Sequence, residues 1–378
     1  MKILHILVDD KFIDMAIREF EAVAPGVHEF AMVEADEPYR YVRTGQIRNL
    51  TDSEFVHEVQ RCEIRGVIFH SLPERRYKLL SSIPAEKKVF WFGWGFDYYD
   101  RLLTSAYPGG LLMSATAAAI RQSKPKKLNK LVRIAKSAVE RGLRLAKLYP
   151  AHPDVKALAR VDYFSPVIDT EFHAAIDSNS WFSPKYICWN YGTVEDDLTI
   201  SARDEMSLGD NFLVGNSATP TNNHYEIFDS IRGRIDLSHR KVIVPLSYGD
   251  PAYRDKILRL GRTMLGDAFT PLVDFMPPDQ YIKILSSCGF VLMNHLRQQA
   301  LGNICISTLM GAKVFLHPRN PLYAWMISQG VVVGDIERLD TVPLTVAEQH
   351  ANCQAIRAYW GREAQRKKTR RVVEIALT

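Results

Sequence analysis

The stretch His295-Leu-Arg-Gln-Gln-Ala-Leu-Gly-Asn-Ile-Cys-Ile-Ser-Thr-Leu-Met-Gly-Ala-Lys-Val-Phe-Leu316 decides the fold, because a polar turn leads into a helix and then into a buried strand. Gly302 would let the backbone approach a ligand closely, and Asn303 would cap a helix that runs to about Met310. Unpaired amides at such a helix start bind anions. Side chains that would grip a diphosphate precede it, namely Arg297, Gln298 and Gln299. An ordinary strand-to-helix connection is the alternative.

Strands and helices alternate along the chain, which predicts an α/β protein with parallel sheets covered on both faces. In the first half we expect strands at 2–8, 27–33, 66–70 and 88–91, with helices at 12–23, 52–61 and 74–82. In the second half we expect strands at 212–214, 241–245, 270–273, 289–293 and 313–316, separated by helices at 224–232, 253–265, 278–286 and 303–310. Two doubly wound, Rossmann-like domains would face each other across a cleft and would bind ligands there, at the carboxyl ends of their strands.

The length supports two domains, since 378 residues exceed what one hydrophobic core usually organises. A polar, acidic and glycine-containing connection between Trp189 and Asn211 marks the expected boundary. The first strand is followed by Val8-Asp-Asp-Lys-Phe12. The absence of a GxGxxG turn there argues against a dinucleotide-dependent enzyme such as a nucleotide-sugar epimerase.

Cysteine usage and hydropathy indicate a reduced, cytoplasmic protein. The five cysteines are scattered without CxxC or metal spacing, so we expect reduced and mostly buried thiols. The apolar run at 2–8 is too short for a signal peptide and ends in Asp9-Asp10. No apolar run approaches the ~20 residues of a membrane span. Work at a membrane would therefore take place on its surface.

A basic amphipathic segment occupies residues 121–149. Apolar residues recur at three- and four-residue steps from Leu128 to Tyr149 and would share one helix face. The basic residues that we expect to contact a membrane or an acceptor are Lys126, Lys127, Lys130, Arg133, Arg141 and Arg144. They would bind anionic lipid headgroups or a diphosphate. A solvated helix face is the alternative.

Several motifs follow one another in the second half of the chain. They are Phe212-Leu-Val-Gly-Asn-Ser217, Asn223-His224, Val242-Ile-Val-Pro-Leu-Ser-Tyr248, Tyr281 with Ile284-Leu285, Arg297-Gln-Gln-Ala-Leu-Gly302 and Asn320-Pro321. In this order, over roughly residues 210–330, they resemble the bacterial TDP-4-acetamido-4,6-dideoxygalactose transferases, glycosyltransferase family 56. The first half matches more thinly, through His5, Asp10, Phe69-His70 and Phe90-Trp-Phe-Gly-Trp-Gly-Phe-Asp97.

This resemblance implies a GT-B glycosyltransferase with an acceptor-binding domain at 1–195 and a nucleotide-sugar-binding domain at 210–345. Helices in 346–378 would pack back on the first domain. The implied reaction moves a 4-acetamido-4,6-dideoxyhexose from a TDP-linked donor to a lipid-linked saccharide, as in synthesis of O-antigen or enterobacterial common antigen. The enzyme would lie on the anionic inner face of the cytoplasmic membrane and bind no nucleic acid. Another donor sugar and nucleotide, or a non-catalytic lipid- or nucleic-acid-binding protein, are the alternatives.

Three further positions are candidates for donor binding. Gly215-Asn216-Ser217 follows the first strand of the second half and would contact the diphosphate or sugar hydroxyls, unless it is a simple turn. Tyr248 would stack on or hydrogen-bond to the nucleobase. Asn320 would hold hydroxyl groups or cap a helix. No Asp-X-Asp tripeptide stands at a strand end in a metal-holding context, so we expect metal-independent transfer.

The catalytic base should follow a strand of the first half. Asp97 is our first choice, because a carboxylate among large aromatic residues can have a raised pKa. Asp10 is the second choice and His70 the third. Each of them would otherwise be a cap or a hydrogen-bonded turn residue.

Overall fold

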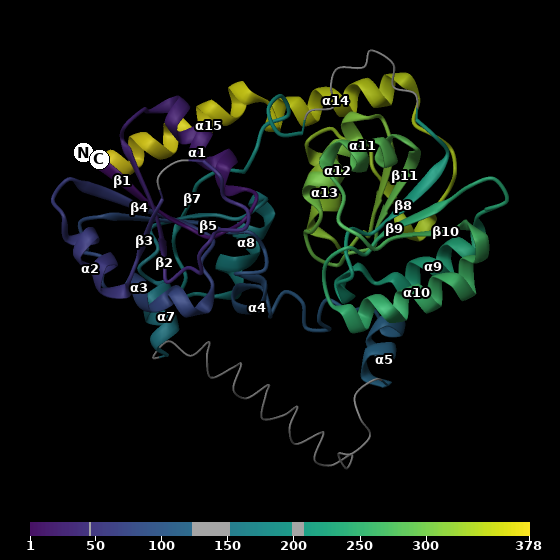
Figure 1. Cartoon of the computed structure of the whole chain (residues 1–378), viewed down its shortest axis with the longest axis horizontal. Helices are drawn as coiled ribbons and strands as arrows, with labels where there is room; N and C mark the ends of the chain where they lie inside the picture. The colour runs from purple at the N-terminus through teal and green to yellow at the C-terminus, as the bar shows by residue number, and fades with distance from the viewer. Residues whose placement is uncertain (45–46, 123–151, 199–207) are drawn as a thin grey trace, which may run out of the picture. The chain divides into compact units, whose positions relative to one another are not determined.

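The computed structural model describes residues 1–44, 47–122, 152–198 and 208–378. The chain forms two compact units (Figure 1). Unit 1 comprises Met1–Pro108, Lys127–Asp197 and Trp360–Thr378. Unit 2 comprises Gly109–Lys126 and Leu198–Tyr359.

Unit 1 is built on a parallel sheet with the strand order β3-β2-β1-β4-β5-β6-β7. The strands are β1 (Lys2–Leu7), β2 (His28–Val33), β3 (Arg48–Leu50), β4 (Ile64–His70), β5 (Lys88–Phe92), β6 (Tyr163–Ser165) and β7 (Lys185–Tyr186). The helices are α1 (Ile13–Val23), α2 (Asp52–Gln60), η1 (Glu74–Arg76), α3 (Tyr77–Leu80), α4 (Tyr99–Leu102), α7 (Pro153–Leu158), α8 (Asp169–Ser178) and α15 (Arg362–Leu377). The strand order reverses direction between β1 and β4.

Unit 2 repeats the plan with the strand order β10-β9-β8-β11-β12-β13, again with parallel pairs. Its strands are β8 (Asn211–Val214), β9 (Val242–Pro245), β10 (Phe269–Leu272), β11 (Cys288–Met293), β12 (Lys313–Leu316) and β13 (Gly334–Asp335). Its helices are α5 (Ser114–Gln122), η2 (Pro220–Asn222), α9 (His224–Arg234), α10 (Pro251–Leu265), η3 (Gly266–Ala268), α11 (Pro278–Ser286), α12 (Leu301–Leu309), α13 (Pro321–Ser328), η4 (Ile336–Arg338) and α14 (Val346–Trp360). Here the order reverses between β8 and β11.

Apolar runs explain why both sheets have buried strands. β11 is buried along its whole length, as expected for a parallel strand covered on both faces. The C-terminal helix α15 packs on β1 and β4 through Val372, Val373 and Ala376. Gly66 in β4 permits this contact, because a Cβ atom there would lie 2.9 Å from the Cβ of Ala376.

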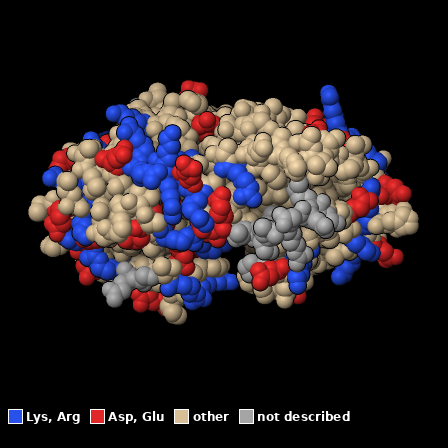
Figure 2. All heavy atoms as spheres, turned by 90° about the horizontal axis from the view of Figure 1, so that it is seen from above, with Lys and Arg blue, Asp and Glu red and all other residues tan. Residues whose placement is uncertain are grey.

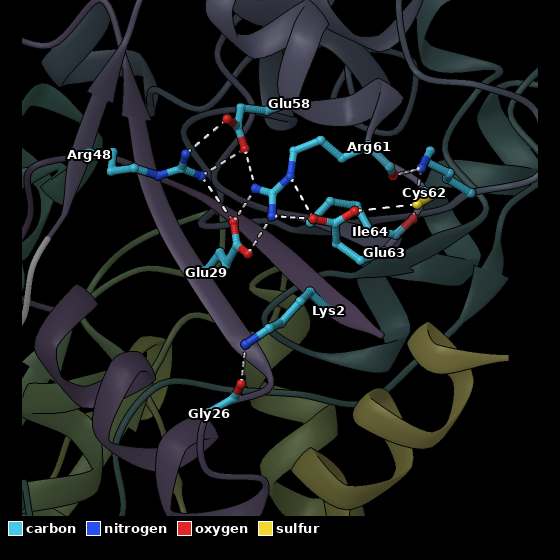
Figure 3. Close-up of polar contacts among 10 residues, drawn as sticks. Lys2, Gly26, Glu29, Arg48, Glu58, Arg61, Cys62, Glu63 and Ile64 are labelled. Carbon is cyan, nitrogen blue, oxygen red and sulfur yellow. Dashed lines mark hydrogen bonds and ion pairs between the residues drawn. The ribbon is translucent and has the colours of Figure 1, made fainter.

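The amino-terminal side of the sheet in unit 1 carries a network of ion pairs (Figure 3). Arg61 pairs with Glu29, Glu58 and Glu63 at 2.6–2.8 Å, and Arg48 bridges Glu29 and Glu58. The hydrogen bond from Arg48, together with Arg61, holds the pKa of Glu58 below its usual value. These ion pairs connect β2, α2 and the start of β4 at the amino-terminal side of the sheet. Ligands of such sheets bind at the opposite side, where the strands have their carboxyl ends.

The expected secondary structure is largely confirmed. The predicted strands and most helices match observed ones with ends shifted by one or two residues, and Thr51 forms the expected cap as part of a capping box with Glu54. The expected helix at 74–82 is instead a 3-10 turn and one short helical turn. Short elements escaped prediction, including β3, β6, β7, β13 and α8. In the described part of the chain, no helix has the length and apolar character needed to cross a membrane.

Candidate functional site

The ends of β8 and β11 bring the sequence-predicted donor residues together in unit 2. Gly215-Asn216-Ser217 directly follows β8, and 294–299 directly follows β11. Because β8 and β11 are parallel neighbours on either side of the reversal in strand order, these two loops meet at one edge of the sheet. Ligands of open α/β sheets bind at such a point.

A chain of amide and hydroxyl groups links the two loops. The side-chain nitrogen Nε2 of Gln299 donates to Asn216 Oδ1 at 2.9 Å, and Asn216 Nδ2 donates to the Tyr248 hydroxyl at 2.7 Å. Thr221 Oγ1 donates to Gln299 Oε1 at 2.8 Å. The structure therefore joins Asn216, Tyr248 and Gln299, three residues singled out from the sequence, into one uncharged network.

Asn222 fixes the loop after β8 and was missed by sequence reasoning. Its Oδ1 accepts hydrogen bonds from the Asn216 backbone N–H and from His295 Nε2, both at 2.9 Å. Its Nδ2 donates to the Ser217 carbonyl at 3.0 Å. Gly215 has φ of +66°, and a Cβ there would lie 2.5 Å from Asn222 Oδ1, so only glycine fits. The one signal in the sequence was its place beside the Asn223-His224 motif.

Helix α12 begins two residues earlier than expected. It starts at Leu301 after Ala300, which adopts a left-handed conformation and makes no side-chain cap. Asn303 is therefore not the cap, and its Nδ2 instead donates to the Tyr281 hydroxyl at 3.0 Å. Gly302 is exposed, and a Cβ there would have no atom within 4 Å, so the turn does not require glycine.

The start of α12 nevertheless has the features of an anion site. It carries no side-chain cap, and the partial positive charge of a helix start attracts anions. Arg297 is half-buried and Gln298 is buried in the turn that leads to it. Open space above Gly302 leaves room for a ligand.

Asn320 follows β12 and caps α13, which confirms the capping alternative. Its Oδ1 accepts the Leu322 N–H at 3.0 Å. Its Nδ2 is buried and has no hydrogen-bond partner among the described residues. That nitrogen remains a donor that a ligand could satisfy.

In unit 1, Asp97 is a buried carboxylate held by three donors. Its Oδ2 accepts from the Leu72 N–H and from Trp91 Nε1 at 2.9 Å, and its Oδ1 accepts from the Trp94 N–H at 2.8 Å. Burial raises the pKa of Asp97, while these hydrogen bonds lower it. The geometry favours a structural role that closes the aromatic loop. It therefore argues against our first choice of base.

His70 belongs to a buried chain of histidines. Its Nε2 contacts His5 Nδ1 at 3.0 Å, His5 Nε2 contacts His28 Nδ1 at 2.9 Å, and His70 Nδ1 contacts the Tyr191 hydroxyl at 2.8 Å. Burial lowers the pKa of His70 to about 3. His70 is therefore neutral at pH 7, and both of its nitrogens are engaged within unit 1, so the geometry does not support it as the base.

The adjacent carboxylates after β1 have different surroundings. Asp9 accepts hydrogen bonds from the backbone N–H groups of 40–42 at 2.6–3.0 Å. Burial acts to raise the pKa of Asp9, but these hydrogen bonds outweigh burial and hold the pKa below its usual value. Asp10 is half-buried and accepts a longer bond, 3.3 Å, from the Phe12 N–H. Burial raises the pKa of Asp10. Asp10 lies at the reversal between β1 and β4, where a substrate would bind.

Other sequence expectations fall elsewhere. Lys126, Lys127, Lys130, Arg133, Arg141 and Arg144 lie outside the described residues. Within the described ranges, no group of three or more histidine, cysteine, aspartate or glutamate residues could hold a metal ion.

The family model described as "4-alpha-L-fucosyltransferase glycosyl transferase group 56" matches residues 184–354. This range contains the motifs from Phe212 to Pro321 that carried the resemblance, which is thereby confirmed.

Solved structures resemble the whole chain. HepE of Anabaena, determined with UDP and glucose, is 12% identical with a TM-score of 0.54, over 100% of this chain and 94% of that one. Sucrose-phosphate synthase of Thermosynechococcus elongatus is 13% identical with a TM-score of 0.57, over 100% and 95%. A glycosyltransferase of Rickettsia africae is 9% identical with a TM-score of 0.59, over 100% and 98%. These likenesses confirm the expected GT-B fold.

Proposed function

We propose that this chain, a glycosyltransferase of group 56, transfers a 4-acetamido-4,6-dideoxyhexose from a TDP-linked donor to a lipid-linked saccharide in bacterial surface polysaccharide synthesis. One observation carries the proposal. The ends of β8 and β11, the amide network of Asn216 and Gln299 and the uncapped start of α12 lie at the carboxyl side of one sheet. That combination suits a nucleoside diphosphate that carries a sugar.

Unit 2 would hold the donor and stabilise the leaving diphosphate. Arg297 would supply a positive charge, and the amides at the start of α12 would point at the phosphate oxygens as negative charge develops. Asn216, Gln299 and Asn320 would bind hydroxyl groups, and Tyr248 would contact the base. With these donors in place, transfer would need no metal ion.

Unit 1 would bind the acceptor and supply the base, for which we propose Asp10. A base must accept a proton from the acceptor hydroxyl within hydrogen-bond reach. Asp10 is less tied by hydrogen bonds than Asp97, and burial raises its pKa, which makes the carboxylate more basic. Asp97 would hold the wall of the acceptor site in shape.

The acceptor's lipid would place the enzyme on an anionic membrane surface. Helix α15 exposes Arg366, Lys367, Arg370 and Arg371 while its apolar face is buried in unit 1. Figure 2, seen from above relative to Figure 1, shows lysine and arginine side chains gathered over the half that holds α15. Each basic residue near such a surface contributes about 1 kcal/mol. The basic segment 121–149, most of which lies outside the described residues, is a second candidate for binding anionic lipid.

Cosedimentation with anionic liposomes tests the membrane contact. Charge reversal at Lys367 and Arg370 should weaken binding, as should added salt. Charge reversal at Arg232 and Arg262, which are exposed on α9 and α10 of unit 2, is the matched control. Equal loss in both double variants would show general charge attraction and no special role of α15.

Calorimetric titration with TDP, UDP, GDP and CMP in the presence of a chelator tests the donor. TDP should bind most tightly, and the chelator should leave its affinity unchanged. A preference for UDP or GDP would point to a different donor for the same kind of transfer. Absence of binding by all four nucleotides would overturn the proposed donor site.

A further inference from the structure

Residues 109–113 come from the first third of the chain, yet they belong to unit 2. The Met113 backbone N–H donates to Asn223 Oδ1 at 2.8 Å, and Asn223 Nδ2 contacts the Leu111 carbonyl at 3.4 Å. Asn294 Nδ2 lies 3.3 Å from the sulfur of Met113. Asn294 directly follows β11, so the Met113 side chain is fixed beside the loops that form the proposed donor site.

The segment is anchored at a second place through α5. The Thr116 backbone N–H donates to Glu226 Oε1 at 2.9 Å, and the Thr116 hydroxyl donates to Glu226 Oε2 at 2.5 Å. Ile120 packs against the hydrophobic core of unit 2. Attachment at both Asn223 and Glu226 restricts the path of the chain between them.

The two asparagines that hold Met113 are themselves buried and joined. Asn223 Nδ2 donates to the Asn294 carbonyl at 3.0 Å, and Asn294 Nδ2 contacts the Asn223 carbonyl at 3.3 Å. Asn223 is fully buried with φ of +53°. Their amide groups are therefore occupied by backbone and by Met113, and the side chain presented beside them is apolar.

We propose that Met113 determines donor specificity by contacting the apolar part of the transferred sugar. This inference rests on the proposed function. A 4-acetamido-4,6-dideoxyhexose has a methyl group where common hexoses have a hydroxymethyl group, and an acetamido group, which ends in a methyl group, in place of the C4 hydroxyl. A methionine side chain is flexible and polarisable and packs well against such groups. It offers no strong hydrogen bond to a hydroxyl at the same place.

The test compares Met113→Ala with Met113→Leu, using the 6-deoxy donor and its 6-hydroxy counterpart. Met113→Ala should lower kcat/KM for the 6-deoxy donor about 10- to 100-fold, the scale of a lost apolar contact in a pocket. Discrimination between the two donors should shrink, while Met113→Leu stays near the parent enzyme. The affinity for TDP, which lacks the sugar, should not change.

Leu112→Ala is the matched control, because Leu112 adjoins Met113 in the same half-buried stretch. Equal effects of Leu112→Ala and Met113→Ala would mean that the segment was merely loosened, and would overturn the proposal. So would an equal loss of kcat/KM with both donors, or a loss of TDP affinity as large as the loss with the sugar donor. Failure of the parent enzyme to bind TDP would instead refute the proposed donor.

Discussion

The carboxyl edges of the two sheets use the same topology with different chemistry. In unit 1 the edge carries ionisable groups, of which Asp9, Asp97 and His70 are engaged by neighbouring donors or rings. In unit 2 the edge carries amides and hydroxyls, with Arg297 beside an uncapped helix start. The point at which the strand order reverses thus determines where a ligand site can form in each sheet, and the side chains there determine its chemistry.

The difference suggests a division of labour. A carboxylate with a raised pKa suits proton transfer, whereas fixed neutral dipoles and one arginine suit a ligand that is already charged. Neutral donors bind a diphosphate without placing a negative group beside it. The contrast therefore supports the proposal that unit 1 supplies the base and unit 2 binds the donor, and each part of that proposal can be tested separately.

The largest effect is expected from Asp10→Asn, which keeps the size of the side chain and removes its basicity. Turnover at saturating donor should fall about 10²- to 10⁴-fold, the usual contribution of a general base. TDP affinity should stay nearly unchanged, since the proposed donor site lies in unit 2. Steady-state kinetics and calorimetry measure the two quantities.

Asp97→Asn is the matched comparison in the same unit. One amide cannot accept the three hydrogen bonds that the carboxylate accepts, so the midpoint of thermal unfolding should fall while the folded enzyme keeps most of its turnover. The reverse outcome, with Asp10→Asn active and Asp97→Asn folded but inactive, would return the role of base to Asp97.

Arg297→Ala tests unit 2 and should have a smaller effect. Loss of a hydrogen bond to a charged phosphate should weaken TDP binding by roughly 1.5–3 kcal/mol, without a comparable change for thymidine, which has no phosphate. Arg262→Ala, at an exposed arginine of α10, provides the control. Unchanged TDP affinity in folded Arg297→Ala would place the diphosphate elsewhere.

The sequence predicted the sheets well because burial on both faces leaves a continuous apolar run, as in β11 and β12. It also gave Asn216, Tyr248 and Gln299 as separate candidates for donor binding, because each follows an expected strand, and the structure joins the three in one network. It could not predict the setting of Asp97, because two of its donors, the Leu72 N–H and the Trp91 indole, face it only after the loop folds back.

Other parts of the site left little trace in the sequence. Helix α5 is short and rich in alanine, and nothing in 114–122 indicates that Thr116 will bond to Glu226 of unit 2. The start of α12 was misplaced because Asn303 is a favoured cap residue, whereas Ala300 in a left-handed conformation is not. Hydrogen bonds between residues distant in sequence decide such details, and local pattern does not encode them.

The smallest effect concerns a feature that both units share, namely buried histidines that are neutral. Burial lowers the pKa of His28 to about 4 and that of His70 in unit 1 and His295 in unit 2 to about 3. An unfolded histidine has a pKa of about 6.5, so below that pH the unfolded chain binds more protons than the folded chain. The stability from each neutral histidine is present above pH 6.5 and is lost as the pH falls toward its folded pKa.

As the pH falls from 6.5 to 5.5, protonation of each of these histidines in the unfolded chain should therefore lower the free energy of unfolding by about 1 kcal/mol. Denaturant unfolding at the two pH values measures the loss. His28→Gln removes one titrating group at the edge of the buried chain, so its loss over this interval should be smaller than that of the parent by about the same amount. If both proteins lose equal stability, the pKa of His28 is the same in the folded and unfolded chains, and burial does not lower it. His28 would then titrate in the folded protein, so the histidine chain of unit 1 would gain charge over this interval and would no longer be a neutral feature that the two units share.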